Sequence, residues 1–249
     1  MSNAVTRGLV LREVNYKEAD KLLTLLTPEG KLTAKARGVR RKGSRLAAAC
    51  QLLTYAEFSL FEYRDYYTVN EADSLEQFWG VKRDVELVAL GSYFAEVCEA
   101  VAGEGVPQPE QLSLILNCLY ALDQLHKPQE QVRAAFELKT ACLAGYEPLL
   151  DACAVCGREP KEPAFHLKEG VLHCAACREE VGEGISLPLT PGALSAMRHV
   201  VYEEQRRLLS FRLDPVSMTR FSDLCEAFLA SQLERGFRTL DFYKQLKRM

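Results

Sequence analysis

The chain has 249 residues, of which 48% are hydrophobic and 26% are charged, a balance typical of globular proteins. Predominant disorder is excluded, because enough apolar surface is present to offset the entropy lost on ordering. The longest uncharged runs stop short of the 18 or so residues that a membrane-spanning helix needs, and the first ten residues lack the pattern of a secretory signal. We therefore expect a cytoplasmic protein without a membrane partner.

The formal net charge of −3 hides an uneven distribution of charge. Residues 1–50 contain 11 Lys and Arg but only 4 Asp and Glu, so this segment is strongly basic and the remainder is acidic. An asymmetry of this size predicts that the N-terminal end meets a polyanion.

The first 80 residues are predicted to form β-structure. Five apolar or alternating segments are bounded by turn signals and cover residues 5–13, 21–27, 31–38, 53–63 and 66–72. A short helical turn is expected at 46–50, between the third and fourth strands. This spacing favours a small closed antiparallel barrel over the main alternative, a fragment of a β-sandwich.

From Val81 onward the apolar period becomes helical. Three stripes lead to Gly145, and two more helices are announced by Thr190-Pro191 and Asp214-Pro215, each a capping residue followed by proline at the first helical position. A last helix is expected over 240–247. Residues 151–187 have no helical period, so we predict an α+β protein with domains at 1–80, 81–150, 151–187 and 188–249. The third is an insertion within one helical domain.

The strongest motif lies in this insertion and consists of two C-x2-C pairs, Cys153/Cys156 and Cys174/Cys177. Two short loops of this kind bring four thiolates onto one structural Zn²⁺, with no open position for catalysis. The alternatives are four reduced core cysteines or a redox dithiol. His173 is expected to be exposed to solvent rather than to serve as a ligand or a donor to one. The other five cysteines should be buried small hydrophobes: Cys50, Cys98, Cys118, Cys142 and Cys225.

A second motif is the basic stretch 31–45, which contains no acidic residue. Spaced cations on a strand and a glycine-flanked loop suit a phosphodiester backbone, although most charge runs are simply solvated. The candidate nucleic-acid-binding residues are Lys31, Lys35, Arg37, Arg40, Arg41, Lys42 and Arg45. Six aromatic residues on the last two strands could stack on bases, and at least half are expected in the core: Tyr55, Phe58, Phe61, Tyr63, Tyr66 and Tyr67.

No recognisable catalytic constellation is present. The four histidines lie outside nucleophile, metal-hydrolase and kinase motifs, and the carboxylates are scattered. We therefore expect a binding protein that is not an enzyme and has no small-molecule substrate.

Three segments resemble the bacterial RecO family of recombination mediators: GLVLREVNYKEADKLLTLLTPEGKLTAKARGVRR, FELKTACLAGYEPLLDACAVCG and FRTLDFYKQL. The resemblance implies an oligonucleotide-binding (OB) barrel, a helical domain and a zinc module. It also implies binding of single- and double-stranded DNA, annealing of complementary strands, and a nucleoid-associated role in DNA repair. Together with RecR, such a protein helps RecA replace the single-stranded-DNA-binding protein.

The resemblance further implies that the helical domain grips the acidic, apolar-ended tail of the single-stranded-DNA-binding protein. The helix over 132–143 offers an apolar Phe136 between Arg133 and Lys139, which we take as candidate partner-binding residues. An RNA-binding factor in translation or ribosome assembly would share the barrel, the zinc and the glycine-flanked basic stretch, and is the main alternative. A dithiol oxidoreductase and a purely structural adaptor are the other classes considered.

Overall fold

The computed structural model describes residues 2–64 and 66–248. The chain packs into two compact units. One contains the residues up to His126 together with those from Phe237 onward, and the other is Lys127–Gly236. The four domain ranges expected from the sequence remain a prediction. In the structure, the first three helices and the last helix pack in the same unit as the barrel.

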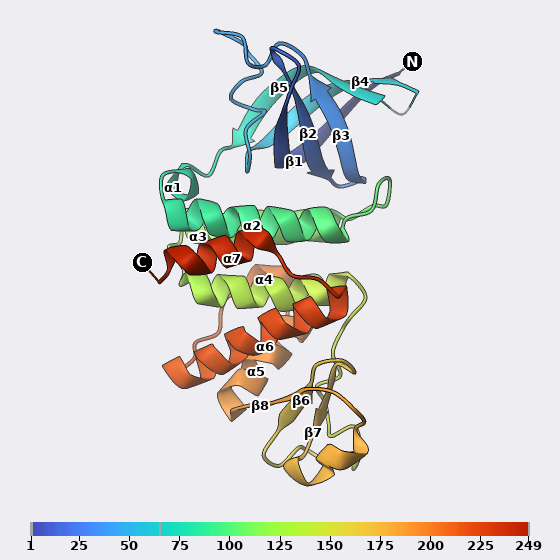
Figure 1. Ribbon diagram of the computed structural model, residues 1–249, viewed down its shortest axis with the longest axis vertical. Coiled ribbons are helices and arrows are strands. Elements are labelled where there is room, and N and C mark those ends of the chain that lie inside the picture. The colour runs from blue at the N-terminus through green and yellow to red at the C-terminus, as the bar shows by residue number, and fades with distance from the viewer. Residues whose placement is uncertain (1, 65, 249) are drawn as a thin grey trace. The chain divides into compact units, whose positions relative to one another are not determined.

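Five strands form the barrel of the first unit (Figure 1). They are β1 (Ser2–Tyr16), β2 (Asp20–Thr27), β3 (Gly30–Ala36), β4 (Tyr55–Tyr63) and β5 (Tyr66–Glu76). The closed order is β1-β2-β3-β5-β4, which confirms the predicted barrel and excludes the sandwich. One pair differs from the antiparallel expectation, because β3 and β5 run parallel where they close the barrel.

Alternation along each strand explains which residues fill the barrel, since successive side chains point to opposite faces. On β4 the buried residues are Ala56, Phe58 and Leu60, and on β3 the buried side chains are those of Ala34 and Ala36. Fewer barrel aromatics are core residues than expected. Of the six candidates only Phe58 is fully buried, whereas Tyr55, Phe61 and Tyr67 are half-buried and Tyr63 and Tyr66 are exposed.

Four helices complete the first unit: α1 (Trp79–Lys82), α2 (Val85–Val101), α3 (Pro109–Asp123) and α7 (Arg238–Leu246). The Asp84 carboxylate accepts hydrogen bonds from the N–H groups of Glu86 (2.9 Å) and Leu87 (3.1 Å) and so caps α2. Gly30 (φ +115°) lets the β2–β3 turn approach the α2–α3 loop, because a Cβ there would lie 2.5 Å from the Val106 carbonyl oxygen. The barrel thus sits directly on the α2–α3 loop.

The second unit combines helices with a small sheet. Its helices are α4 (Gln129–Leu143), α5 (Pro191–Tyr202) and α6 (Pro215–Leu233), and its strands β6 (Ala164–His166), β7 (Val171–His173) and β8 (Ser186–Pro188) pair in the order β7-β6-β8. Both predicted caps are confirmed. Thr190 Oγ1 accepts from the Ala193 N–H (3.1 Å), and Asp214 Oδ1 accepts from the Ser217 N–H (3.0 Å).

The sheet of the second unit is held against α6 by aromatic packing. The rings of Phe165 on β6 and Phe228 on α6 meet edge to face with centroids 5.2 Å apart, and both are buried. The small sheet therefore packs on α6, and 151–187 as a separate domain stays a prediction. Across the described ranges, no helix combines the length and the apolar character that crossing a membrane would require.

Candidate metal centre and nucleic-acid interface

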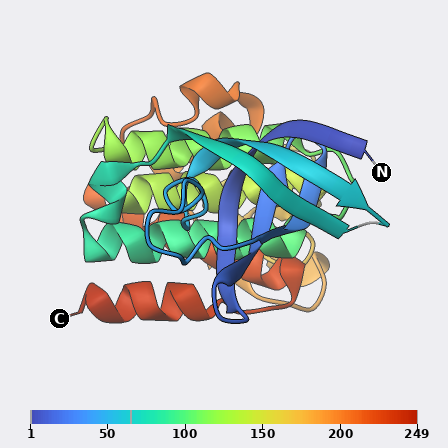
Figure 2. The same ribbon diagram turned by 90° about the horizontal axis from the view of Figure 1, so that it is seen from above.

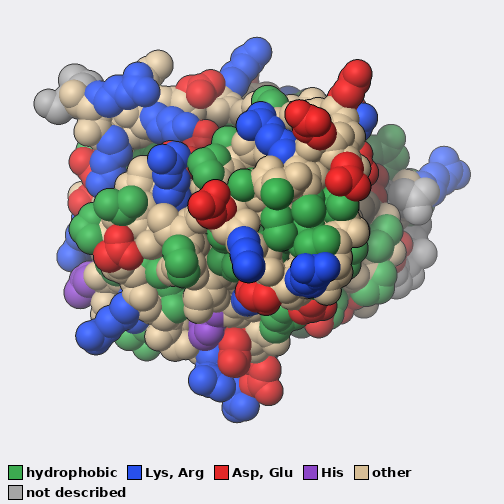
Figure 3. Space-filling view, turned by 90° about the horizontal axis from the view of Figure 1, so that it is seen from below, with side chains coloured by type: hydrophobic (Ala, Val, Ile, Leu, Met, Phe, Trp, Pro, Cys, Tyr) green, Lys and Arg blue, Asp and Glu red, His purple; other side chains and the backbone are tan. Residues whose placement is uncertain are grey.

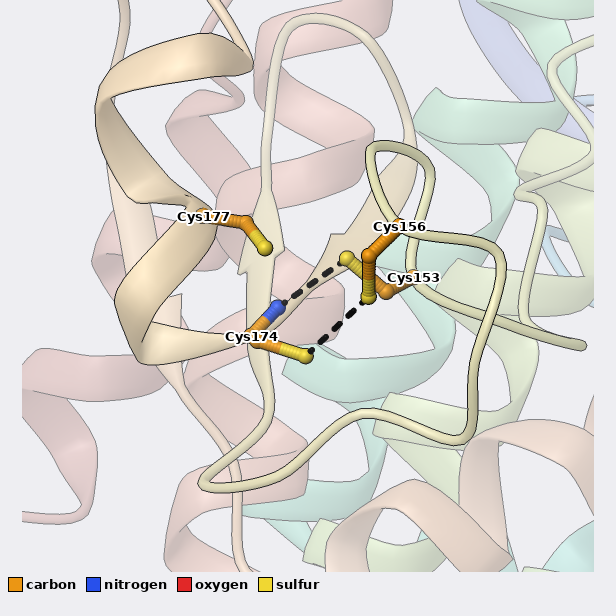
Figure 4. Close-up of side chains that lie close together, drawn as sticks. All are labelled: Cys153, Cys156, Cys174 and Cys177. Atoms are coloured by element: carbon orange, nitrogen blue, oxygen red, sulfur yellow. Dashed lines mark hydrogen bonds between the residues drawn. The ribbon is translucent and has the colours of Figure 1, made fainter.

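Four cysteine side chains converge in the 151–187 module (Figure 4). Cys153 and Cys156 come from the loop that follows α4, Cys174 follows β7, and Cys177 lies in a 3₁₀ turn (Ala175–Glu180). All four Sγ atoms lie within 4.8 Å of one another, and those of Cys156 and Cys174 are 3.9 Å apart. The two C-x2-C pairs predicted from the sequence therefore form one cluster.

Backbone hydrogen bonds shape both cysteine turns. The Gly157 N–H donates to the Cys153 carbonyl (2.9 Å), with Gly157 at φ +68°, and the Cys177 N–H donates to the Cys174 carbonyl (3.0 Å). A third bond joins the two turns, since the Cys174 N–H donates to Cys153 Sγ (3.3 Å). These hydrogen bonds therefore hold the two cysteine turns so that their four sulfur atoms lie close together.

The geometry and charge of the cluster fit a metal ion. Sulfurs that bind one Zn²⁺ tetrahedrally at about 2.3 Å lie about 3.8 Å apart, close to the separation between Cys156 and Cys174. Burial and the neighbouring Cys153 and Cys156 thiols raise the pKa of Cys177 to about 12. Burial also raises the pKa of Cys153. Hydrogen bonds from the N–H groups of Cys156 and Cys174 outweigh this effect and lower the pKa of Cys153 to about 6. A cation would therefore expel protons from the cluster as it binds.

His173 is not exposed, contrary to our expectation. It is fully buried, with Nδ1 2.9 Å from the Cys174 carbonyl oxygen and Nε2 2.8 Å from Ser186 Oγ. Both His173 and the neighbouring Leu172 on β7 are fully buried, so the strand does not follow a simple alternation, and the ring lies next to the second cysteine turn. His173 therefore links that turn to β8 and lies outside the four-sulfur group.

The remaining cysteines lie apart from the cluster. Cys50, Cys98, Cys118 and Cys225 are buried as predicted, and Cys142 is half-buried. Burial raises the pKa of Cys50, Cys98 and Cys142 to about 12, so these thiols stay protonated at neutral pH.

Two of the seven candidate DNA-binding cations, Lys31 and Lys35, already interact with other residues of the protein. The Lys31 ammonium donates to the Glu99 carbonyl (2.9 Å) and is half-buried. The Lys35 ammonium pairs with Asp20 (3.0 Å) and lies 5.0 Å from the centroid of the Tyr16 ring. Both nevertheless lie on the β3 face that the sequence alternation predicted.

The other five cations are exposed and lie on the connection from β3 to β4. The backbone of this connection is seen from above in Figure 2. Arg40 donates to the backbone carbonyl of Glu18 (3.2 Å). Because this acceptor is neutral, it does not compensate the positive charge of the guanidinium. The remaining four form no ion pair with any residue that the structure describes: Arg37, Arg41, Lys42 and Arg45. We use the name basic loop for residues 37–45.

The basic loop is anchored to the β1–β2 turn, through a residue that sequence reasoning missed. Asp20 Oδ1 accepts a hydrogen bond from the Gly38 N–H (2.8 Å), and the Arg40 N–H donates to the Ala19 carbonyl (2.9 Å). The Gly38 N–H and Lys35 hold the pKa of Asp20 below its ordinary value. No sequence motif identifies Asp20, because its partners lie 15 or more positions along the chain.

The three candidate partner-binding residues do not form an exposed pocket. Arg133 is buried and paired with Glu137 (3.1 Å) and Glu226 (2.6 Å), and Phe136 is fully buried. The Lys139 ammonium donates to the Val201 carbonyl (2.9 Å). The apolar stripe of α4 faces α6 and α5, so the geometry on which the partner prediction depended is not present.

Charge on the face shown in Figure 3 is mixed, with basic and acidic side chains interspersed among hydrophobic ones. Interspersed signs are the ordinary pattern of a solvated surface. The stretch of residues 31–45 differs from that pattern, because it contains seven cations and no carboxylate.

A closed five-stranded barrel with a basic strand and loop, joined to helices and a four-cysteine cluster, defines the class of OB-barrel proteins with a cysteine-rich module that could hold a metal ion. Family comparisons agree with that class. Residues 1–78 match the model described as "Recombination protein O N terminal", and residues 82–241 match "Recombination protein O C terminal". The chain belongs to the RecO family of DNA repair proteins, which confirms the resemblance.

Similar proteins cover the chain along nearly its whole length. "DNA repair protein RecO" of Acetivibrio thermocellus is 32% identical over 252 residues, which span 100% of this chain and 99% of that protein. The proteins of the same name from Desulforudis audaxviator and Myxococcus xanthus are each 32% identical, over 99% and 96% of this chain and 98% and 96% of their own lengths.

Proposed function

We propose that this protein is a cytoplasmic, nucleoid-associated mediator of DNA repair and recombination. It binds single- and double-stranded DNA and anneals complementary strands. With RecR it helps to load RecA onto DNA covered by the single-stranded-DNA-binding protein, whose acidic tail it contacts. Family membership and the basic loop support this function, and the loop is the single structural observation that carries it.

Annealing of this kind requires no catalytic residue. Two complementary strands repel each other through their phosphates, and cations that neutralise phosphates release condensed counterions and raise the encounter rate. Arg37, Arg41, Lys42 and Arg45 are available for this purpose because no described carboxylate pairs with them. The protein therefore acts as a binding surface, without turnover of a small-molecule substrate.

We further propose that the cluster of Cys153, Cys156, Cys174 and Cys177 binds one structural Zn²⁺. Four thiolates satisfy a tetrahedral zinc ion and leave no position for a reactive water. The ion would supply rigidity to the module, and His173 and Ser186 would orient the second cysteine turn.

Strand annealing in vitro tests the proposed function. Two complementary oligonucleotides carrying a fluorescence donor and acceptor are mixed with wild type and with Arg40→Ala/Arg41→Ala/Lys42→Ala. Wild type should accelerate annealing, and the triple variant should lose most of that acceleration. A matched control, Arg206→Ala/Arg207→Ala/Arg212→Ala, removes three exposed cations from a segment in which Glu204 and Glu203 pair with two of them, and should behave as wild type.

Complementary RNA strands of equal length provide the discriminating arm. A preference for RNA over DNA in binding and annealing would contradict the DNA repair function and favour the RNA-binding alternative. Equal annealing by wild type and by the triple variant would move the DNA site away from the basic loop.

A further inference from the structure

The chain's single tryptophan lies at the surface of the barrel-containing unit. Trp79, the first residue of α1, is 52% exposed. The Lys82 ammonium lies 5.8 Å from the centroid of the Trp79 ring, and the Arg83 guanidinium carbon lies 5.9 Å from it. An exposed indole beside two cations complements a ligand that carries both aromatic rings and negative charge.

The turn before α1 directs this indole outward. Glu76 Oε1 accepts hydrogen bonds from the N–H groups of Gln77 (2.8 Å) and Phe78 (3.0 Å). Phe78 adopts φ +49°, a conformation that bulky residues rarely take, while its ring is buried. The backbone conformation at Phe78 therefore places the Phe78 ring in the core and leaves the Trp79 ring exposed.

Further contacts hold α1 in place. Asp123 Oδ1 accepts a hydrogen bond from the Val81 N–H (2.8 Å), and Gly80 allows the close approach, because a Cβ there would lie 2.8 Å from the same oxygen. Lys82 donates to Thr54 Oγ1 (2.7 Å). A helix of four residues is unstable alone. These contacts therefore hold α1, and with it Trp79, in a fixed position on the unit.

Helix α1 adjoins the end of the β3–β4 connection, which begins with the basic loop (Figure 1). Thr54, which Lys82 contacts, is the last residue of that connection, and Tyr55 on β4 pairs with Glu76 on β5 just before α1. One connection of the chain therefore carries the basic loop at its start and meets α1 at its end.

We propose that Trp79 stacks on an unpaired base of single-stranded DNA while the exposed Arg83 approaches the adjacent phosphate. This inference rests on the proposed DNA-binding function and adds to it a contact on α1, outside the barrel. Stacking uses the face that every base has, so the contact is independent of sequence. In a duplex the base faces are covered by their neighbours, so this contact favours single strands.

Tryptophan fluorescence reports on this contact directly, because the chain has no other tryptophan. Oligo(dT) and a blunt duplex of equal phosphate content are titrated into wild type, and binding is measured in parallel by anisotropy of labelled DNA. Oligo(dT) should quench the Trp79 emission in step with binding, and the duplex should bind with much less quenching.

Variants separate stacking from charge. Trp79→Ala should weaken oligo(dT) binding roughly 5- to 150-fold and leave the salt dependence unchanged, because the indole carries no charge. Trp79→Phe should restore most of the affinity. Arg83→Ala should instead reduce the slope of log K against log salt by roughly 0.7. Phe242→Ala is the matched control, because Phe242 is exposed to the same 52% but has no cation over its ring among the described residues.

The outcomes distinguish this inference from the proposed function. Oligo(dT) binding by wild type without quenching, or a Trp79→Ala affinity within twofold of wild type, would overturn the Trp79 contact and leave DNA binding by the basic loop intact. An equal loss in Phe242→Ala would also overturn the contact. Failure of wild type to bind any DNA would overturn the proposed function and this inference together.

Discussion

Arg133 is central to the packing of α4 against α6. Its guanidinium pairs with Glu137 and Glu226 and donates to Ser222 Oγ (2.6 Å), and Glu137 is fully buried. Removing one partner of a buried pair leaves the other charge without compensation. Arg133→Met should therefore lower the free energy of unfolding by roughly 3–5 kcal/mol, measured by urea denaturation.

The exposed pair Arg7–Glu57 provides the control for Arg133. Both of its side chains are largely accessible to water, so Arg7→Met should cost no more than about 1 kcal/mol. Equal effects of Arg7→Met and Arg133→Met would show that the Arg133 pair is not a stabilising feature of the second unit.

Single residues divide into those that sequence could place and those that it could not. The caps Thr190 and Asp214 were predictable because their partners lie three positions away. The burial of His173 and Arg133 was not, because each also has partners on other elements: Ser186 on β8 for His173, and Ser222 and Glu226 on α6 for Arg133. Local spacing describes a residue's face, but only packing reveals what covers that face.

At the scale of the element, Asp20 determines how much of the positive charge on β3 is left unpaired. Its carboxylate neutralises Lys35 and accepts the Gly38 N–H. Asp20→Asn keeps an acceptor for Gly38 but removes the negative charge. We expect tighter binding to single-stranded DNA, with a salt slope steeper by roughly 0.7, because Lys35 gains a phosphate contact.

The pH dependence of this anchor follows from the lowered pKa of Asp20. A depressed folded-state pKa means that the carboxylate stabilises the loop above its unfolded pKa of about 3.9 and loses this effect as the pH falls through the lower folded value. An unchanged salt slope in Asp20→Asn would mean that Lys35 does not reach phosphate even when released.

If the proposed zinc ion is bound, the 151–187 module should depend on it for order. Cys153→Ser and Cys174→Ser should each reduce zinc content from about one per chain and expose this segment to protease, since metal affinity supplies folding free energy there. Cys142→Ser, outside the cluster, should retain the metal. Full zinc content in both ligand variants, measured by elemental analysis, would rule out this site.

Elements were more predictable than their pairing. Period-2 and helical patterns located all five barrel strands and the long helices, because each pattern reflects which face is buried. The parallel pairing of β3 with β5 and the attachment of α7 to α2 in the first unit depend on contacts far apart in sequence. The spacing of residues along the chain does not predict which distant segments contact one another.

For the whole molecule, the uneven distribution of charge is the feature that links sequence to function. The basic first 50 residues fold into β1–β3 and the basic loop, and the four-cysteine cluster lies in the other compact unit. The family comparisons place this arrangement among DNA repair proteins. The central claim is therefore that the basic loop contacts the DNA backbone.

A salt titration of single-stranded DNA binding tests this claim most directly. Wild type is compared with Arg40→Ala/Arg41→Ala/Lys42→Ala and with the Arg206/Arg207/Arg212 control. Three lost phosphate contacts should weaken binding alike on all sequences and reduce the slope of log K against log salt by roughly 2, whereas the control keeps the wild-type slope. A triple variant with the wild-type slope and affinity, or a loss confined to one DNA sequence, would contradict the account.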